Sequence, residues 1–146
     1  MDETPALVDA QREKLQESDR TRRRLATELA QASGRELYTG TAPGPDDVRR
    51  MLRRVESLSE ESRAEAQSFT AAGPAIFLAA TENPPSVLLA ASKNAGIHAG
   101  DVLKRALSEA GGRGGGNATL AQGSVPSKEA LDQLVASLTS LLKFTS

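Results

Sequence analysis

The chain contains the stretch Gly111-Gly112-Arg113-Gly114-Gly115-Gly116-Asn117-Ala118-Thr119-Leu120-Ala121-Gln122-Gly123, whose first six positions hold five of its twelve glycines. Glycine loses more backbone entropy on folding than other residues. Such a run is therefore either a disordered linker or a loop that needs positive φ angles or a close backbone approach. Apolar residues at helical spacing precede the glycines, and a short apolar segment follows them. Because both flanks predict ordered elements, we expect an ordered loop.

The residues around this glycine run resemble a known family. The segment Ala99-Gly100-Asp101-Val102-Leu103-Lys104, the doubled glycine before the glycine triplet, and Ala121 and Gly123 behind it are similar to the DHHA1 domain. The resemblance covers residues 75–142 and is greatest to the version at the carboxyl end of alanyl-tRNA synthetase and its relatives. The phosphodiesterase branch of the family usually carries a histidine where Asn117 stands, so this departure favours the synthetase-like branch.

The resemblance implies a noncatalytic domain that grips the body of tRNA. Such a domain assists a separate aminoacylation or editing domain of the same parent enzyme, and in some relatives it supports dimerisation. The arginine in the run is planar and always charged, which suits contact with phosphates or stacking on bases. The expected nucleic-acid-binding residues are Arg113, Gly114, Gly115, Gly116, Asn117 and Lys93.

Other interpretations of the same residues stay open. The glycines can serve a tight helix-to-strand crossover, or their N–H groups can form an anion-binding nest. A homodimerisation module that binds no nucleic acid would use the helix predicted over residues 5–33 and the apolar faces of the sheet. The substrate-binding domain of a DHH phosphodiesterase is a third alternative.

The composition limits the size of the core and the reach of its charge. With 146 residues and 38% hydrophobic content, the chain can build one modest core and an appended helix. The net charge of −1 gives no general attraction to a polyanion, so any contact with nucleic acid must be local. Near-neutral charge and few aromatic side chains on which bases could stack favour the dimerisation hypothesis. The aromatic residues are Tyr38, Phe69, Phe77 and Phe144.

Several chemistries are excluded by what the sequence lacks. There is no cysteine, and His98 is the single histidine, so the zinc-dependent editing centre of synthetase relatives cannot form. The Asp-His-His run of DHH phosphodiesterases is absent, and the glycine run lacks the Gly-Lys-Ser/Thr ending of a P-loop. We therefore expect no catalytic residue, cofactor or metal, no membrane partner, and a cytoplasmic location.

The patterning predicts an α/β fold, in which a small mixed sheet covered by helices follows a long N-terminal helix. The predicted order is α-β-α-β-β-α-β-α, divided into an N-terminal helix over 1–34 and a DHHA1-like globular domain over 35–146. Helices are predicted over 5–33, 46–67, 98–110 and 127–143, and strands over 36–40, 75–80, 86–91 and 118–122.

Three finer predictions depend on these elements. Gly34 should stop the first helix, which carries the partial heptad Val8, Leu15, Leu25 and Leu29. Lys93, Asn94 and His98 should converge near the glycine run. Four arginines share one face of the second predicted helix, where they form either a phosphate track or an ordinary solvated surface; they are Arg49, Arg50, Arg53 and Arg54.

Overall fold

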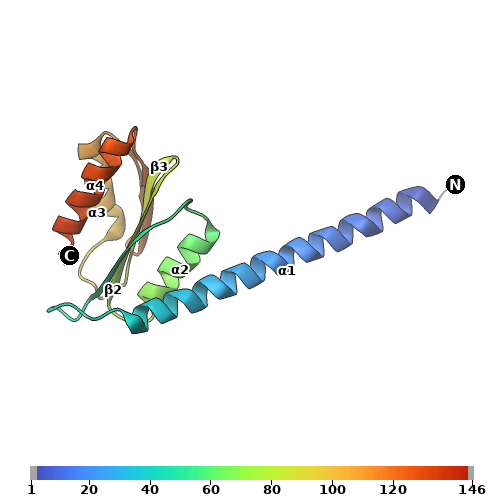
Figure 1. The fold of residues 1–146 in the computed structure, drawn as a ribbon, viewed down its shortest axis with the longest axis horizontal. Helices are drawn as coiled ribbons and strands as arrows, with labels where there is room; N and C mark the ends of the chain where they lie inside the picture. Colours follow the sequence, from blue (N-terminus) through green and yellow to red (C-terminus); the bar gives the residue numbers. More distant parts are fainter. Residues whose placement is uncertain (1–2, 145–146) are drawn as a thin grey trace.

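A long helix leads into a five-stranded sheet that is covered by helices on both faces (Figure 1). The computed structural model describes the backbone of residues 3–144 and the side chains of residues 16–144. The elements are α1 (Glu3–Gly40), β1 (Arg49–Arg54), α2 (Glu60–Ala71), β2 (Ala75–Glu82), β3 (Pro85–Ala91), α3 (Ala99–Ala110), β4 (Arg113–Gly116), β5 (Leu120–Ser124) and α4 (Lys128–Leu141).

The strands lie in the order β1-β2-β3-β5-β4. β1 pairs with β2 in parallel, whereas β2–β3, β3–β5 and β5–β4 are antiparallel, so the sheet is mixed. α2 and the carboxyl-terminal part of α1 cover one face, and α3 and α4 cover the other. The predicted α/β class, long N-terminal helix and order of helices and sheet segments are confirmed.

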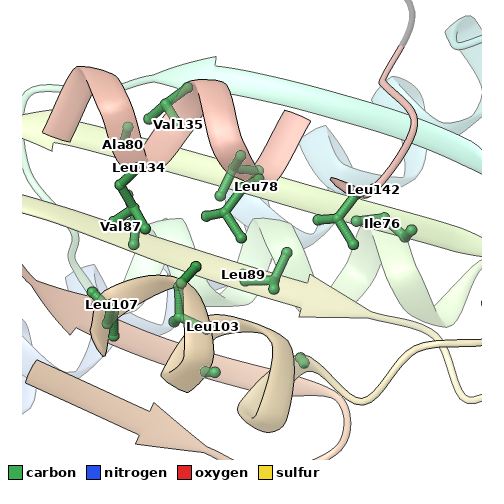
Figure 2. Packing of buried hydrophobic residues seen from close by; sticks show 14 of the residues in the cluster. Ile76, Leu78, Ala80, Val87, Leu89, Leu103, Leu107, Leu134, Val135 and Leu142 are labelled. Atoms are coloured by element: carbon green, nitrogen blue, oxygen red, sulfur yellow. The ribbon is translucent and has the colours of Figure 1, made fainter. Parts of the chain in front are cut away.

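The larger cluster of the core lies between the sheet and the pair α3 and α4. β2 and β3 contribute alternate residues to it, as their pleat requires. Both strands are buried along nearly their whole length, which agrees with the two-sided cover predicted from their continuous apolar runs. Figure 2 shows the main contacts, made by Leu103 and Leu107 of α3 and Leu134 and Val135 of α4 with Leu78, Val87 and Leu89.

The second cluster lies under α2. Phe69 packs edge-to-face on Phe77, with ring centroids 5.5 Å apart, and Tyr38 packs on Phe69 in the same way at 5.7 Å. Small residues of β2 and β3 complete this layer. Three of the chain's four aromatic rings therefore join α1, α2 and β2 in one stack.

α1 is longer than predicted, because Gly34 does not stop it. The backbone stays helical to Gly40, so the strand predicted over residues 36–40 is wrong. Gly34 is buried where α1 crosses α2, and a Cβ atom there would meet the backbone of Glu65 and lie 2.9 Å from Ser68 Cβ. The glycine thus allows two helices to approach closely. The division at residue 34 between a helix and a globular domain stays a prediction.

The helix predicted over residues 46–67 is also wrong in its first half. Residues 49–54 form β1, which pairs with β2 from Arg49↔Ala75 to Arg54↔Ala80. The apolar residues there fit both a helical and a strand period, and pairing with a buried strand decides between them. Asp46 caps a turn by accepting from Val48 N–H instead of starting a helix. The helix begins at Glu60, after the N-cap Ser59.

The remaining elements follow the sequence-based expectations closely. The hairpin β2–β3 and the helices α3 and α4 lie where they were predicted, and Ser127 caps α4 by accepting from Ala130 N–H. The strand predicted over 118–122 begins two residues later, as β5. Of the partial heptad, the side chains of Val8 and Leu15 lie outside the described residues.

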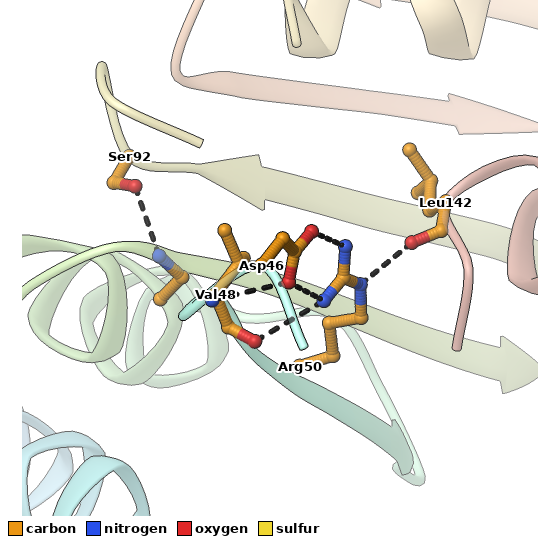
Figure 3. A network of polar contacts seen from close by, with 6 residues as sticks. Asp46, Val48, Arg50, Ser92 and Leu142 are labelled. Atoms are coloured by element: carbon orange, nitrogen blue, oxygen red, sulfur yellow. Dashed lines mark hydrogen bonds and ion pairs between the residues drawn. The ribbon is translucent and has the colours of Figure 1, made fainter. Parts of the chain in front are cut away.

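Arg50 fixes the carboxyl end of α4 to β1 (Figure 3). Its guanidinium pairs with both carboxylate oxygens of Asp46, at 2.9 and 2.6 Å, and its Nε donates to the Leu142 carbonyl at 2.6 Å. The Arg50 guanidinium holds the pKa of Asp46 well below its usual range, and Asp46 in turn raises the pKa of Arg50. Arg50 therefore has a structural role, because its guanidinium group is bound within the chain.

Candidate nucleic-acid interface

The glycine run forms β4, which is an edge strand and not the loop that was expected. Residues 113–116 are extended, pair with β5 from Arg113↔Ser124 to Gly116↔Ala121, and are all exposed. Glycine is generally depleted in β-strands, so a strand with three glycines is unusual. In an extended strand, successive N–H groups point in opposite directions, so residues 113–116 do not form an anion-binding nest.

Gly114 is a glycine because the backbones approach closely. Its φ angle is 157°, and a Cβ atom there would meet the backbone of Gln122 and Gly123 and lie 2.9 Å from Leu107 Cδ1 of α3. A side chain would push β4 away from β5 or α3. Gly116 has the same constraint, since its Cβ would lie 2.5 Å from Ala121 Cα. These glycines support the crossover interpretation.

Gly115 has no such structural reason. A Cβ atom there would find nothing within 4 Å, and its φ angle does not fall in the range that favours glycine. The fold would accept a side chain at this position. The bare backbone of residue 115 is therefore left unexplained by contacts within the described chain.

Gly115 lies on a part of the sheet that none of the described helices covers. α3 packs on β3, β4 and β5 from one side, whereas α2 packs on β2 and β3 from the other. Gly114 faces Leu107 of α3, so alternation places Arg113 and Gly115 on the α2 side. Gln122, which pairs with Gly115, lies on that side too, because its neighbour Ala121 belongs to the α3 cluster. We call this surface of Arg113, Gly115 and Gln122 the open face.

Lys93 lies at the far end of the open face from Arg113. It lines a pocket of about 520 Å³ together with Gln67 and Thr70 of α2 and Thr119 before β5. Arg113 pairs with Ser124 at the opposite end of β5. Four residues of strand separate Arg113 from Asn117, which begins the turn before β5. At about 3.4 Å per residue, this separation is roughly 13 Å. The two predicted cations therefore mark the two ends of one surface.

Asn117 shapes the turn between β4 and β5. Its side-chain oxygen accepts from Thr119 N–H at 3.0 Å, Leu120 N–H at 2.9 Å and the Thr119 hydroxyl at 3.1 Å. An asparagine that bonds the backbone two and three residues on is a turn-forming residue. Its carboxamide oxygen is thus committed within the chain.

The convergence of Lys93, Asn94 and His98 near the glycine run stays a prediction, although Lys93 and Asn94 do lie close to this turn. Lys93 and Asn94 line the same pocket as Thr119. His98 caps α3 by accepting from Asp101 N–H, and the next two helix N–H groups, of Ala99 and Gly100, donate to the carbonyls of Ala118 and Asn117. The amino end of α3 is therefore closed by the turn.

The four arginines of β1 do not form a phosphate track. They alternate between the two faces of the strand, and each has a partner within the chain. Arg49 stacks over the Tyr38 ring at 4.2 Å, and Arg53 pairs with Glu65 at 2.5 Å. Arg54 lies 3.5 Å from Asp132, and Arg50 holds Asp46.

One cation beside the open face was missed by sequence reasoning. Arg63 lies on α2 one turn before Gln67, and both residues share the side of the helix that borders the Lys93 pocket. Among the described side chains, no carboxylate lies within ion-pair distance of Arg63, Lys93 or Arg113. The i, i+4 spacing of residues 63 and 67 was visible, but their orientation depends on how α2 packs.

Comparison with protein families agrees with this geometry. The model of the DHHA1 domain matches residues 63–143, from α2 to the end of α4. The chain belongs to the DHHA1 domain family. The match spans β4, β5 and the loop that carries Lys93, so the whole open face lies within the family's domain.

A solved structure shares the fold. The crystal structure of the C-Ala domain from Aquifex aeolicus alanyl-tRNA synthetase superposes with a TM-score of 0.53 at 22% identity, covering 65% of this chain and 89% of that one. At this identity the likeness concerns the fold. It includes a larger part of this DHHA1 chain than the family model does.

The described residues include neither a helix that could span a membrane nor a cluster of metal ligands. No helix in that part of the chain is long and apolar enough to cross a membrane. Within the same residues, no three His, Asp or Glu side chains gather as a metal site would require.

Proposed function

We propose that this chain is a noncatalytic tRNA-binding domain, of the kind at the carboxyl end of alanyl-tRNA synthetase and its relatives. It grips the body of the tRNA and helps a separate aminoacylation or editing domain of the same parent enzyme to hold its substrate. Membership of the DHHA1 family and the shared fold of the C-Ala domain support this proposal.

The observation that carries the proposal is the bare backbone at Gly115. The fold does not require a glycine there, yet the residue stands exposed between Arg113 and the Asn117 turn. Without a side chain, a sugar or phosphate can approach the strand closely. Arg113 beside it supplies a fixed charge that can pair with a phosphate.

The charges around the open face also support contact with RNA. Lys93 and Arg113 stand at its two ends and Arg63 on the bordering helix, and all three lack an ion-pair partner among the described residues. The net charge of the chain is −1, so attraction to RNA has to come from such a local group. Contacts of this kind position the RNA without reading its sequence.

The first experiment measures binding of the chain to alanine tRNA and to an unrelated tRNA by fluorescence anisotropy across a salt series. We expect affinity to fall steeply with salt, and the slope to decrease by about one for each of Arg113→Ala and Lys93→Ala. Lys104→Ala, an exposed cation on α3, is the matched control. Unchanged affinity in a folded Arg113→Ala/Lys93→Ala double variant would overturn the proposal.

A second experiment tests the close approach at Gly115. Gly115→Leu adds a side chain where the fold has room, so the variant should keep its stability but bind tRNA more weakly. The tRNA affinity of Gly115→Ala should lie between those of the parent and Gly115→Leu. Full tRNA affinity in Gly115→Leu would mean that RNA does not approach this strand.

Homodimerisation without nucleic acid is the second candidate function. The faces of β2 and β3 are buried under helices, so α1 is left for this role. Leu25 and Leu29 lie one turn apart on α1 and are 50% and 72% exposed. Analytical ultracentrifugation at micromolar concentration tests this candidate. A monomer would rule it out, and a dimer that Leu25→Ser/Leu29→Ser dissociates would support it.

A further inference from the structure

We propose that the pocket beside Lys93 receives a nucleobase of the bound RNA. The inference rests on the proposed function and adds a specific role to one end of the open face. The pocket lies where α2 ends, β3 ends and β5 begins, and its volume of about 520 Å³ is within the range of small-molecule sites. Its chemistry favours a flat, neutral group with hydrogen-bonding edges.

The lining combines small apolar residues with polar side chains. Ala71, Gly73 and Ala91 present no long side chains. A planar ring can therefore lie against these residues in van der Waals contact. Two amides, one hydroxyl and one ammonium group of the lining come from Gln67, Asn94, Thr70 and Lys93.

The charges in the pocket argue against a phosphate inside it. The last turn of α2 points its carbonyl oxygens toward this end of the sheet, and no basic residue in that turn offsets them. The carboxyl end of a helix behaves as roughly half a negative charge. Because Lys93 is the single cation of the lining and no carboxylate is present, the site is close to neutral. A nucleobase suits it better than an anion.

The two amides of the lining are available for hydrogen bonding. Neither the Gln67 nor the Asn94 side chain has a partner among the described residues, and both residues are exposed. Thr119, in contrast, donates its hydroxyl to Asn117. An amide offers a donor and an acceptor side by side, which matches the edge of a base. Unpaired nucleotides of folded RNA present such edges.

The direct test is a titration of the isotope-labelled chain with AMP, CMP, GMP and UMP, and separately with ribose 5-phosphate. We expect at least one nucleotide to shift the side-chain amide resonances of Gln67 and Asn94, while ribose 5-phosphate leaves them in place. Gln133, exposed on α4, is the control resonance. The proposal is overturned if no nucleotide shifts these amides, or if ribose 5-phosphate shifts them equally.

A second measurement separates this inference from the proposed function. Gln67→Ala/Asn94→Ala should weaken tRNA binding about tenfold without changing the salt slope, since two neutral hydrogen bonds are lost. Lys93→Ala should instead lower the slope, and Gln133→Ala should change neither. If tRNA binds and the double variant equals the parent, the pocket proposal fails and the function stands. If tRNA does not bind at all, the function fails, and the nucleotide titration still decides the pocket.

Discussion

Arg50 donates a hydrogen bond of 2.6 Å from its Nε to the carbonyl oxygen of Leu142, 92 residues later. The bond joins β1, which follows the long helix, to the residue that ends α4. Leu142 is itself buried in the larger core cluster. One guanidinium group therefore links the first strand to the end of the last helix.

Arg50→Ala should destabilise the chain by about 1–3 kcal/mol, because it leaves a buried carbonyl without its donor. Arg54→Ala is the matched control: its ion pairs, at 3.5 and 3.9 Å, are half exposed, so its loss should cost at most about 0.5 kcal/mol. Urea denaturation of both variants measures the difference. Equal stability of the two would show that the Leu142 contact contributes little.

The stability contributed by Asp46 should depend on pH in one direction. Arg50 lowers the pKa of this carboxyl in the folded state. The contribution is therefore complete above the unfolded-state pKa, near the ordinary value of 3.8, and is lost as pH falls through the lower folded-state pKa. Melting temperatures of the parent and Asp46→Asn should differ by a constant amount above about pH 5 and converge in stronger acid. A gap that widens below pH 4 would contradict this assignment.

Alanine at two neighbouring glycines of β4 should have opposite effects. Gly114→Ala places a methyl group against β5 and α3 at a φ angle of 157°, which should cost about 1–3 kcal/mol. Gly115→Ala meets no atom and restricts the unfolded chain, so it should stabilise by about 0.4–1 kcal/mol. Thermal denaturation of the pair tests the assignment, and the same sign for both would refute it.

Gly34→Ala should weaken the docking of α1 on α2. Overpacking against a backbone costs about 1–3 kcal/mol, which exceeds the roughly 1 kcal/mol that alanine gains over glycine inside a helix. Gly40→Ala is the control, since a Cβ atom at the end of the helix meets nothing within 4 Å. Limited proteolysis within residues 16–40 should be faster in Gly34→Ala than in Gly40→Ala. Equal rates would mean that the two helices adjust without loss.

Continuous apolar runs were the part of the sequence that predicted structure best. The central hairpin was predicted correctly from residues 75–91, because short continuous apolar runs are typical of strands that are buried on both faces. Residues 49–54 were wrongly predicted as helix, because their arginines and apolar residues fit a helix as well as a strand. Only their pairing with β2 determines that they form a strand. Glycine is depleted in strands, so β4 could not be predicted as a strand either.

The candidate site was predicted in its components but not in its arrangement. Arg113, Gly115 and Lys93 were named from the sequence, and they border one surface. Gly114 and Gly116 turned out to face neighbouring backbone or α3. Arg63 and Gln67 join the surface through the orientation of α2 on the sheet, which no local pattern encodes.

The burial of β2 and β3 on both faces has a consequence for how the molecule opens. Their amides are reached by solvent only when both helical layers leave the sheet, which amounts to global unfolding. The exposed stretch of α1 over residues 16–25 is held by its own turns alone and can fray separately. Hydrogen exchange should thus be slowest at Leu78 and Leu89 and many orders of magnitude faster in that stretch, so protection is graded along one chain.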